Sequence, residues 1–155
     1  MTKNTNWLDE RETGVWRGFL EASQQLVAAM DRQLVQESQL SGAEFAVLVP
    51  LSEQADGVVR ARDLARSLGW DRSRLSHLLK RMEARGLLKR KHCSSDARGL
   101  DVEITRDGRN AIELAAPGHV DFVRTRFFDH LTRDEQDALA SVSGKIIAAL
   151  QPECG

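Results

Sequence analysis

Residues 71–105 read DRSRLSHLLKRMEARGLLKRKHCSSDARGLDVEIT and carry most of the information about the fold. Asp71 is a favourable helix N-cap and Gly86 a favourable stop, so a helix is expected between them. From residue 100 onward, apolar and polar residues alternate, which is typical of a half-buried strand. Residues 87–105 are therefore predicted to form a β-hairpin with its loop near residues 94–99.

A shorter helix is expected immediately before this segment. Residues 61–68 place Leu64, Ala65 and Leu68 on one face, and Gly69 supplies the C-cap. Only Gly69 and Trp70 then separate the two helices, and so short a turn makes them a helix-turn-helix. The hairpin that follows has the position of a wing.

The segments before the motif are predicted to be helical. Between residues 15 and 35, apolar residues recur at spacings of three and four, which predicts one long helix with an apolar stripe. Ser41 and Glu44 fit a capping box that starts a second helix. Pro50 is expected to kink that helix or end it early, because an interior proline costs about 3 kcal/mol.

The chain after the hairpin returns to helix. Residues 105–131 are helical by composition, with a bend or break expected at Pro117 and Gly118. Thr132 and Glu135 form another capping box, and the last helix has an apolar face that consists of Leu139, Val142, Ile146 and Leu150. The predicted fold class is mainly α with a small β-hairpin wing (α+β), in a single domain that spans residues 1–155.

Charge is unevenly distributed along the chain. The formal net charge is −1, yet residues 60–109 hold 14 Lys and Arg against 7 Asp and Glu. The remaining residues hold 8 basic and 16 acidic side chains. A basic block of this kind attracts phosphates. A single run of charge also fits a solvated helix face, so the arrangement of the side chains has to decide.

The predicted helix at 71–85 has the layout of a DNA major-groove reader, with apolar residues on one face, polar side chains opposite and arginines on the flank. The candidates for base contacts in the major groove are Arg72, Ser73, Ser76, His77 and Lys80. The candidates for phosphate contacts are Arg62, Arg74, Arg81, Arg85, Lys89, Arg90 and Lys91. In the wing loop, Arg98 is predicted to enter a minor groove and Asp96 to brace the loop.

These residues resemble the MarR family of winged helix-turn-helix regulators. The segment RKHCSSDARGLDVEITRDG at residues 90–108 fits the family's wing pattern of an arginine, then D-x-R, then an alternating strand that ends in threonine and glycine. The segment LSHLLKRMEARGLLKR at residues 75–90 is similar to the family's recognition helix and its E-x-x-G ending. Pro50 departs from a helix that is usually continuous, and Gly99 departs from the pattern after the wing arginine.

The resemblance implies an architecture and a function. Residues 56–109 would form the DNA-binding lobe, and residues 7–40 and 110–151 would form the dimerisation helices of an obligate homodimer. It implies a transcriptional regulator, most often a repressor, that binds a pseudo-palindromic operator in double-stranded DNA with half-sites about 10 bp apart. In the family, the arginine that matches Arg98 enters the minor groove and the aspartate that matches Asp96 braces the wing.

Family members commonly release DNA when a small anionic or phenolic effector binds, or when a cysteine is oxidised. Cys93 follows four basic residues that favour its thiolate, so a thiol-oxidation switch is an alternative to an inert hairpin cysteine. The side chains that are candidates for an effector pocket are Trp16, Arg17, Phe19, Phe45 and Arg62. Aromatic residues at helical spacing are more often part of a core, which is the competing interpretation.

Other classes of function have less support. No nucleotide-binding loop or nucleophile motif occurs, so neither enzymatic activity nor a cofactor is predicted. No metal site is predicted, with a zinc site from His119, Asp121 and His130 left open. With no signal peptide and no apolar run of membrane-span length, the chain is expected to be cytoplasmic, nucleoid-associated and prokaryotic. The main alternative is a winged-helix module that binds an acidic protein.

Overall fold

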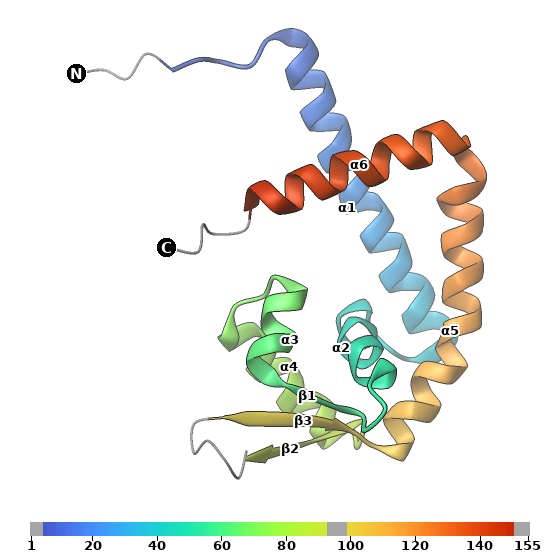
Figure 1. The fold of residues 1–155 in the computed structure, drawn as a ribbon. Helices are drawn as coiled ribbons and strands as arrows, with labels where there is room; N and C mark the ends of the chain where they lie inside the picture. Colours follow the sequence, from blue (N-terminus) through green and yellow to red (C-terminus); the bar gives the residue numbers. More distant parts are fainter. Residues whose placement is uncertain (1–4, 93–98, 151–155) are drawn as a thin grey trace.

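The structure is a computed structural model that describes residues 5–92 and 99–150, and it confirms the predicted fold class (Figure 1). Residues 93–98 lie outside the described part, and with them the candidates Cys93, Asp96 and Arg98. The elements in chain order are α1 (Glu10–Ser38), α2 (Gly42–Glu53), β1 (Val58–Arg60), α3 (Ala61–Leu68), α4 (Arg72–Ala84), β2 (Leu88–His92), β3 (Leu100–Ile104), α5 (Arg106–Arg126), the short 3-10 helix η1 (Phe128–His130) and α6 (Arg133–Leu150).

The helix ends follow the local capping signals. The Ser41 hydroxyl accepts from the Glu44 N–H at 3.1 Å, and the Glu44 carboxylate accepts from the Ser41 N–H at 2.9 Å. The Asp71 carboxylate accepts from the third residue of its helix, at 2.8 Å. Gly69 ends α3 and Gly86 follows the end of α4, and both have left-handed φ values, of 64° and 76° respectively. The predicted helix-turn-helix boundaries are confirmed.

Neither interior proline ends its helix. α2 continues past Pro50 to Glu53, and α5 runs without a break through Pro117. Of the predicted alternatives, the early end at Pro50 and the break at Pro117 are therefore excluded. Leu48 and Leu51, on either side of Pro50, are fully buried. Most of the stability of a helix in a protein comes from packing of its apolar face, and here that packing outweighs the local cost of the missing N–H.

The wing contains one strand more than the predicted hairpin. β1 pairs antiparallel with β3, which gives a three-stranded sheet in the order β1-β3-β2. Val59 lies opposite Val102, and Val102 is fully buried. The extra strand anchors the base of the wing to the segment between α2 and α3, so the wing is part of the lobe rather than a free hairpin.

The hydrophobic core lies beneath α4. The apolar residues of this helix, Leu75, Leu78, Leu79 and Met82, are at most 4% exposed. They pack with the end of α1, with α2, with α3 and with the wing strands in one cluster. Burial of each such side chain is worth about 1.5–3 kcal/mol, so α4 is held firmly by one face and presents the other.

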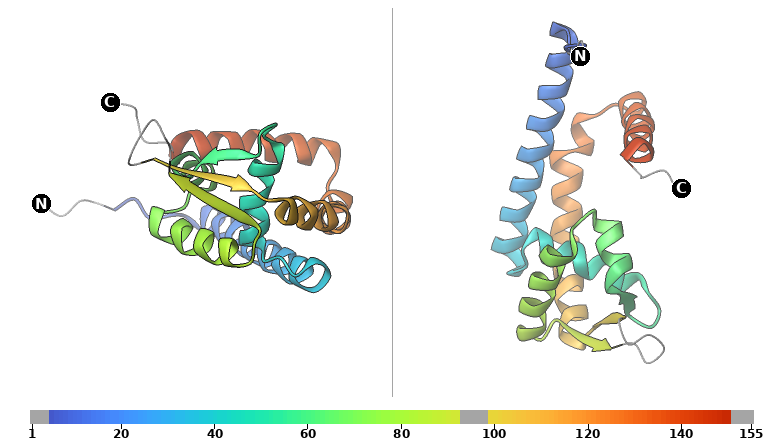
Figure 2. Two further views of the ribbon diagram at one scale, coloured as in Figure 1. Left: turned by 90° about the horizontal axis from the view of Figure 1, so that it is seen from below. Right: turned by 90° about the vertical axis from the view of Figure 1, so that its left-hand side faces the viewer.

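The first half of α1 and the whole of α6 project from this lobe (Figures 1 and 2). The two helices cross in Figure 1, but the right-hand view of Figure 2 shows α6 standing apart from α1. No residue of α6 is buried. The large apolar side chains exposed on α1 and α6 are Val15, Trp16, Phe19, Val27, Val35, Val142, Ile146, Ile147 and Leu150. None of the described helices has the length and apolar character needed to cross a bilayer.

Candidate nucleic-acid interface

The solvent face of α4 carries all five residues predicted to contact bases. Arg72, Ser73, Ser76, His77 and Lys80 are exposed, whereas the intervening leucines are buried. The helix is amphipathic in the way the sequence predicted, and the exposed side chains are hydrogen-bond donors and acceptors of the kinds that pair with base edges.

A hollow lies along each long side of α4. The first, of about 340 Å³, separates α4 from α3 and from the start of β3, and its polar lining consists of Arg60, Arg62, Arg72 and Ser76. The second, of about 550 Å³, faces α2 and is lined by Arg74, His77, Lys80 and Arg81. Cations therefore border the exposed helix on both sides, which is where the phosphate backbones pass when a helix enters a major groove.

Trp70 orients one of these cations. The Arg74 guanidinium carbon lies 4.3 Å from the centroid of the Trp70 ring, within the range of a cation–π contact. The Trp70 N–H donates to the Ala65 carbonyl at 3.0 Å, which fixes the turn between α3 and α4. From the sequence, Trp70 was considered only as part of the turn between the two helices. Its position four residues before Arg74 could have indicated this contact.

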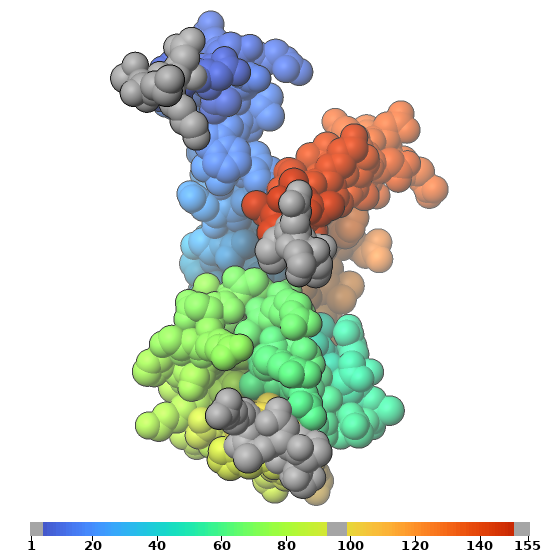
Figure 3. Space-filling view, turned by 60° about the vertical axis from the view of Figure 1, so that its left-hand side comes forward, coloured from blue at the N-terminus to red at the C-terminus, as the bar shows by residue number. Residues whose placement is uncertain are grey.

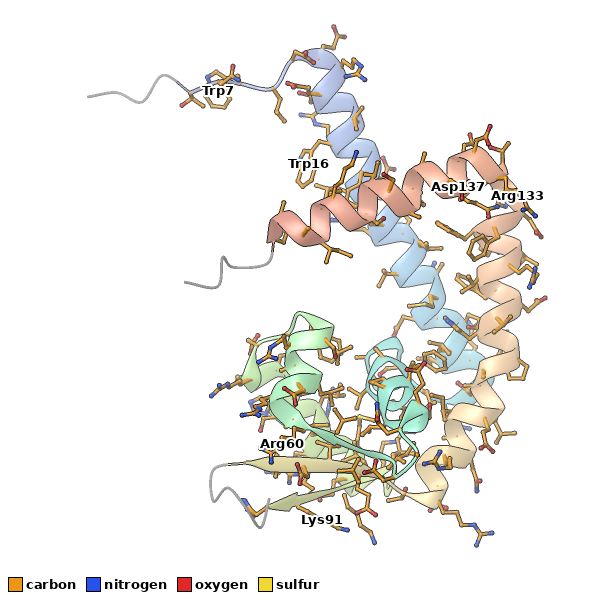
Figure 4. All side chains as sticks on the ribbon, viewed as in Figure 1. Trp7, Trp16, Arg60, Lys91, Arg133 and Asp137 are labelled. Carbon is orange, nitrogen blue, oxygen red and sulfur yellow. The ribbon has the colours of Figure 1, made fainter. Side chains whose placement is uncertain are left out.

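The wing strands carry basic side chains with acidic partners across the sheet. Lys89 is exposed, and Lys91 forms an ion pair with Glu103. Arg60 Nε lies 3.9 Å from the Asp101 carboxylate. Figure 4 shows Arg60 and Lys91 at the wing, at the opposite end of the molecule from Trp7 and Trp16. Both pairs are partly exposed, and ion pairs near the surface contribute at most about 1 kcal/mol.

Two arginines predicted to contact phosphate have internal partners. Arg90 donates through its backbone N–H and its side chain to Glu83, and the guanidinium of Arg85 binds Glu44. The hydrogen bond from the Arg90 backbone N–H is the largest cause that lowers the pKa of Glu83, and the side-chain hydrogen bond from Arg90 is the second. Both guanidinium groups thus brace the lobe.

A separate cavity of about 480 Å³ lies between α2 and α5. Phe45 and His119 line it, with ring centroids 4.6 Å apart, together with Arg109. Burial lowers the pKa of His119, and its Nδ1 is buried without a hydrogen-bond partner in the described residues. Of the predicted effector contacts, Phe45 belongs to this cavity, whereas Arg62 lines the hollow beside α4. Within residues 5–92 and 99–150, no cluster of metal-ligating side chains occurs.

The space-filling view shows the lobe of α3, α4 and the wing as one mass, with α1 and α6 rising from it (Figure 3). The model of the MarR family matches residues 38–99, the span from the end of α1 to the residue before β3. Sco3205, a MarR family transcriptional regulator from Streptomyces coelicolor solved in complex with DNA, is 36% identical, with a TM-score of 0.93 over 97% of this chain and 95% of that chain. This chain belongs to the MarR family.

Other similar proteins bind DNA or repress transcription. BpsR from Bordetella bronchiseptica, whose DNA binding is regulated by 6-hydroxynicotinic acid, is 27% identical, with a TM-score of 0.73 over 86% of this MarR family chain and 98% of BpsR. The transcriptional repressor YetL from Bacillus subtilis (strain 168) is 23% identical over 111 residues, which cover 72% of this chain. The match spans 66% of YetL, slightly less than two thirds of its length.

Proposed function

We propose that this MarR family protein is a sequence-specific transcriptional regulator that binds double-stranded operator DNA as a homodimer. One observation carries the proposal: α4 buries four apolar side chains and exposes seven polar or basic ones, between two hollows that are both lined by arginines. This is the arrangement of a helix whose exposed face reads base edges while its flanks bind phosphates.

The proposal divides the exposed side chains into two groups. Arg72, Ser73, Ser76, His77 and Lys80 contact base edges in the major groove. The cations at the flanks and on the wing position the lobe by binding phosphates, and they are Arg62, Arg74, Arg81, Lys89 and Lys91. By the family resemblance, Arg98 enters the minor groove and Asp96 braces the wing. Arg85 and Arg90 are not among the proposed phosphate contacts, because Glu44 and Glu83 hold their guanidinium groups.

The homodimer is proposed from the exposed apolar side chains of α1 and α6, which lie in the predicted dimerisation segments 7–40 and 110–151. Water-exposed apolar surface of this extent marks an interaction site. Two copies related by a two-fold axis would cover each other's surface and present two copies of α4 to half-sites about 10 bp apart. The operator is therefore expected to be pseudo-palindromic.

Repression with release by an effector is the finer part of the proposal. The cavity between α2 and α5 is lined by Phe45, His119 and Arg109, together with Glu113 and several apolar side chains. The rings and the guanidinium group suit a small phenolic or anionic molecule. A ligand there would contact a helix of the lobe and the helix that leads to α6. The proposed setting is the prokaryotic cytoplasm, where operator DNA lies. Thiol oxidation at Cys93 stays a prediction from sequence.

Selection from a pool of random duplexes tests the function. Duplexes retained by the purified protein would be sequenced after several rounds, with the triple variant Ser76→Ala, His77→Ala, Lys80→Ala selected in parallel. The proposal expects a two-fold symmetric motif with half-sites about 10 bp apart for the wild type, and a degenerate motif for the variant. A retained pool with the composition of the input would contradict it and favour the module that binds an acidic protein.

A further inference from the structure

A polar hub joins the end of α1, the start of α2 and the end of α4. Arg85 is the C-cap residue of α4. Its Nη1 lies 2.6 Å from both carboxylate oxygens of Glu44, and its Nη2 donates to the Gln39 carbonyl at 2.9 Å. Both terminal nitrogens of the guanidinium therefore contact the α1–α2 corner, which is more than 40 residues away in sequence.

Glu44 is the reason that Arg85 is held in place. Among the described residues, Glu44 is the one buried charged side chain, with 7% of its surface exposed. Its carboxylate also accepts from the Ser41 N–H as part of the capping box of α2, so it cannot turn toward water without uncapping the helix. A buried carboxylate needs a cation nearby, and Arg85 supplies it.

The corner that Arg85 binds is itself fixed to α1. Gln39, the C-cap residue of α1, has a left-handed φ of 59°, and its N–H donates to the Val35 carbonyl. Three residues later, the Gly42 N–H donates to the Asp31 carboxylate at 2.6 Å. Through these contacts the first turn of α2 is attached to the side of α1. The hub therefore connects α4 to α1 without passing through the wing.

We infer that Arg85 is a positioning residue that sets the angle between the recognition helix α4 and the dimerisation helix α1. In a two-fold dimer this angle fixes the separation of the two copies of α4, and hence the spacing of half-sites that the dimer accepts. The inference rests on the proposed function. It assigns Arg85 a role different from the phosphate contact that the sequence predicted.

The test measures binding of the wild type and the Arg85→Gln variant by fluorescence anisotropy. The DNA probes are the selected operator, the operator with one half-site scrambled, and operators with the spacer changed by one base pair. Each is titrated over a salt series. Arg81→Gln is the matched control, because Arg81 lies one turn earlier on α4 and lines the hollow beside it.

A positioning role has a distinct signature. Arg85→Gln is expected to weaken binding to the full operator at least about tenfold, to leave half-site binding within about twofold, to keep the salt slope and to reduce discrimination between spacer lengths. Arg85→Lys restores part of the affinity because it keeps the counter-ion. Arg81→Gln weakens both probes and lowers the salt slope by about 0.9 for each lost phosphate contact.

Thermal unfolding followed by circular dichroism shows whether Arg85→Gln folds. If it does not, Glu44→Gln still distinguishes a positioning role of Arg85 from a phosphate contact. Loss of the carboxylate frees Arg85, so a positioning role predicts weaker binding to the full operator and a phosphate role predicts equal or tighter binding. Equal losses on both probes with a lower salt slope, or no change in Arg85→Gln, would overturn the inference while the function stands. Failure of the wild type to select any operator would refute the function itself.

Discussion

Arg90 in β2 forms a two-point contact with Glu83 in the last turn of α4. Its Nε and Nη2 donate to one carboxylate oxygen at 2.9 and 2.7 Å, and its backbone N–H donates to the other at 2.9 Å. The two residues lie on either side of the Gly86 turn. This contact joins β2 to the end of α4, so in the proposed complex the two are expected to approach DNA together.

Glu83→Gln is expected to make unfolding less sensitive to acid. The hydrogen bonds from Arg90 hold the pKa of Glu83 below its ordinary 4.5, so the carboxyl binds fewer protons in the folded state than in the unfolded state. Its contribution to stability is therefore present above about pH 4.5 and is lost as the pH falls through the folded pKa. Urea midpoints measured from pH 7 to pH 3 should fall less steeply in the variant than in the wild type. Glu113→Gln, at an exposed position of α5, is the control, and identical curves for all three proteins would contradict the pairing.

His119→Gln is expected to change how stability depends on pH between pH 7 and pH 5, above the range in which Glu83 acts. Burial lowers the pKa of His119 below its ordinary 6.5, so the unfolded chain binds more protons than the folded one between these two values. Wild-type stability should thus be complete above pH 6.5 and should decrease as the pH falls through the folded pKa. The variant should lack this decrease between pH 7 and pH 5, as followed by thermal unfolding. His130→Gln, an exposed histidine, should behave like the wild type, and a wild-type stability that rises on acidification would contradict the assignment.

Lys80→Ala and His77→Ala are expected to change the base preference of the protein. Each base contact contributes about 1–3 kcal/mol of discrimination between bases. At one position of every half-site, each variant should therefore tolerate base substitutions that the wild type rejects. Selection of operator variants by sequencing measures this directly. Lys145→Ala removes the same kind of side chain from an exposed position of α6 and should leave the preference unchanged. Identical preferences for the wild type and both variants would remove α4 from base reading.

Ile147→Asp is expected to dissociate the proposed dimer. Ile147 is 59% exposed on α6, and a carboxylate in its place would have to be desolvated on association. Sedimentation velocity at micromolar protein should show a dimer for the wild type and a shift toward monomer for the variant, with loss of operator binding. Gln54→Asp, at an exposed position after α2, serves as the control. A wild type that sediments as a monomer at every concentration would contradict the dimer.

Features of this protein that depend on neighbouring residues were predictable from the sequence. Asp71 precedes α4 and Gly86 follows it, as expected from the sequence. Helix caps depend on hydrogen bonds and φ values within a few residues of the helix end. The orientation of α4 was also predictable, since the periodicity of its leucines defines the buried face.

Features that depend on distant partners were not predictable. β1 joins the sheet only because β3, about 40 residues later, offers a free edge. The exposed candidates Arg85 and Lys80 look alike in the sequence, yet a buried Glu44 holds Arg85. Pro50 behaves as it does because the leucines beside it are buried in the core, which local propensity does not register. The sequence therefore predicted which side chains α4 exposes, whereas the internal partners of Arg85 and Arg90 became apparent only in the fold.

The most direct test of the central claim is competition binding with the selected operator as the labelled probe. Unlabelled operator and random duplex of equal length would compete for the protein at several salt concentrations. The account predicts that the operator competes at concentrations at least about 10³-fold lower than random duplex. It also predicts that the logarithm of the binding constant falls linearly with the logarithm of the salt concentration, with a slope of about −0.9 for each phosphate bound. Equal competition by both duplexes across the salt series would contradict sequence-specific DNA binding.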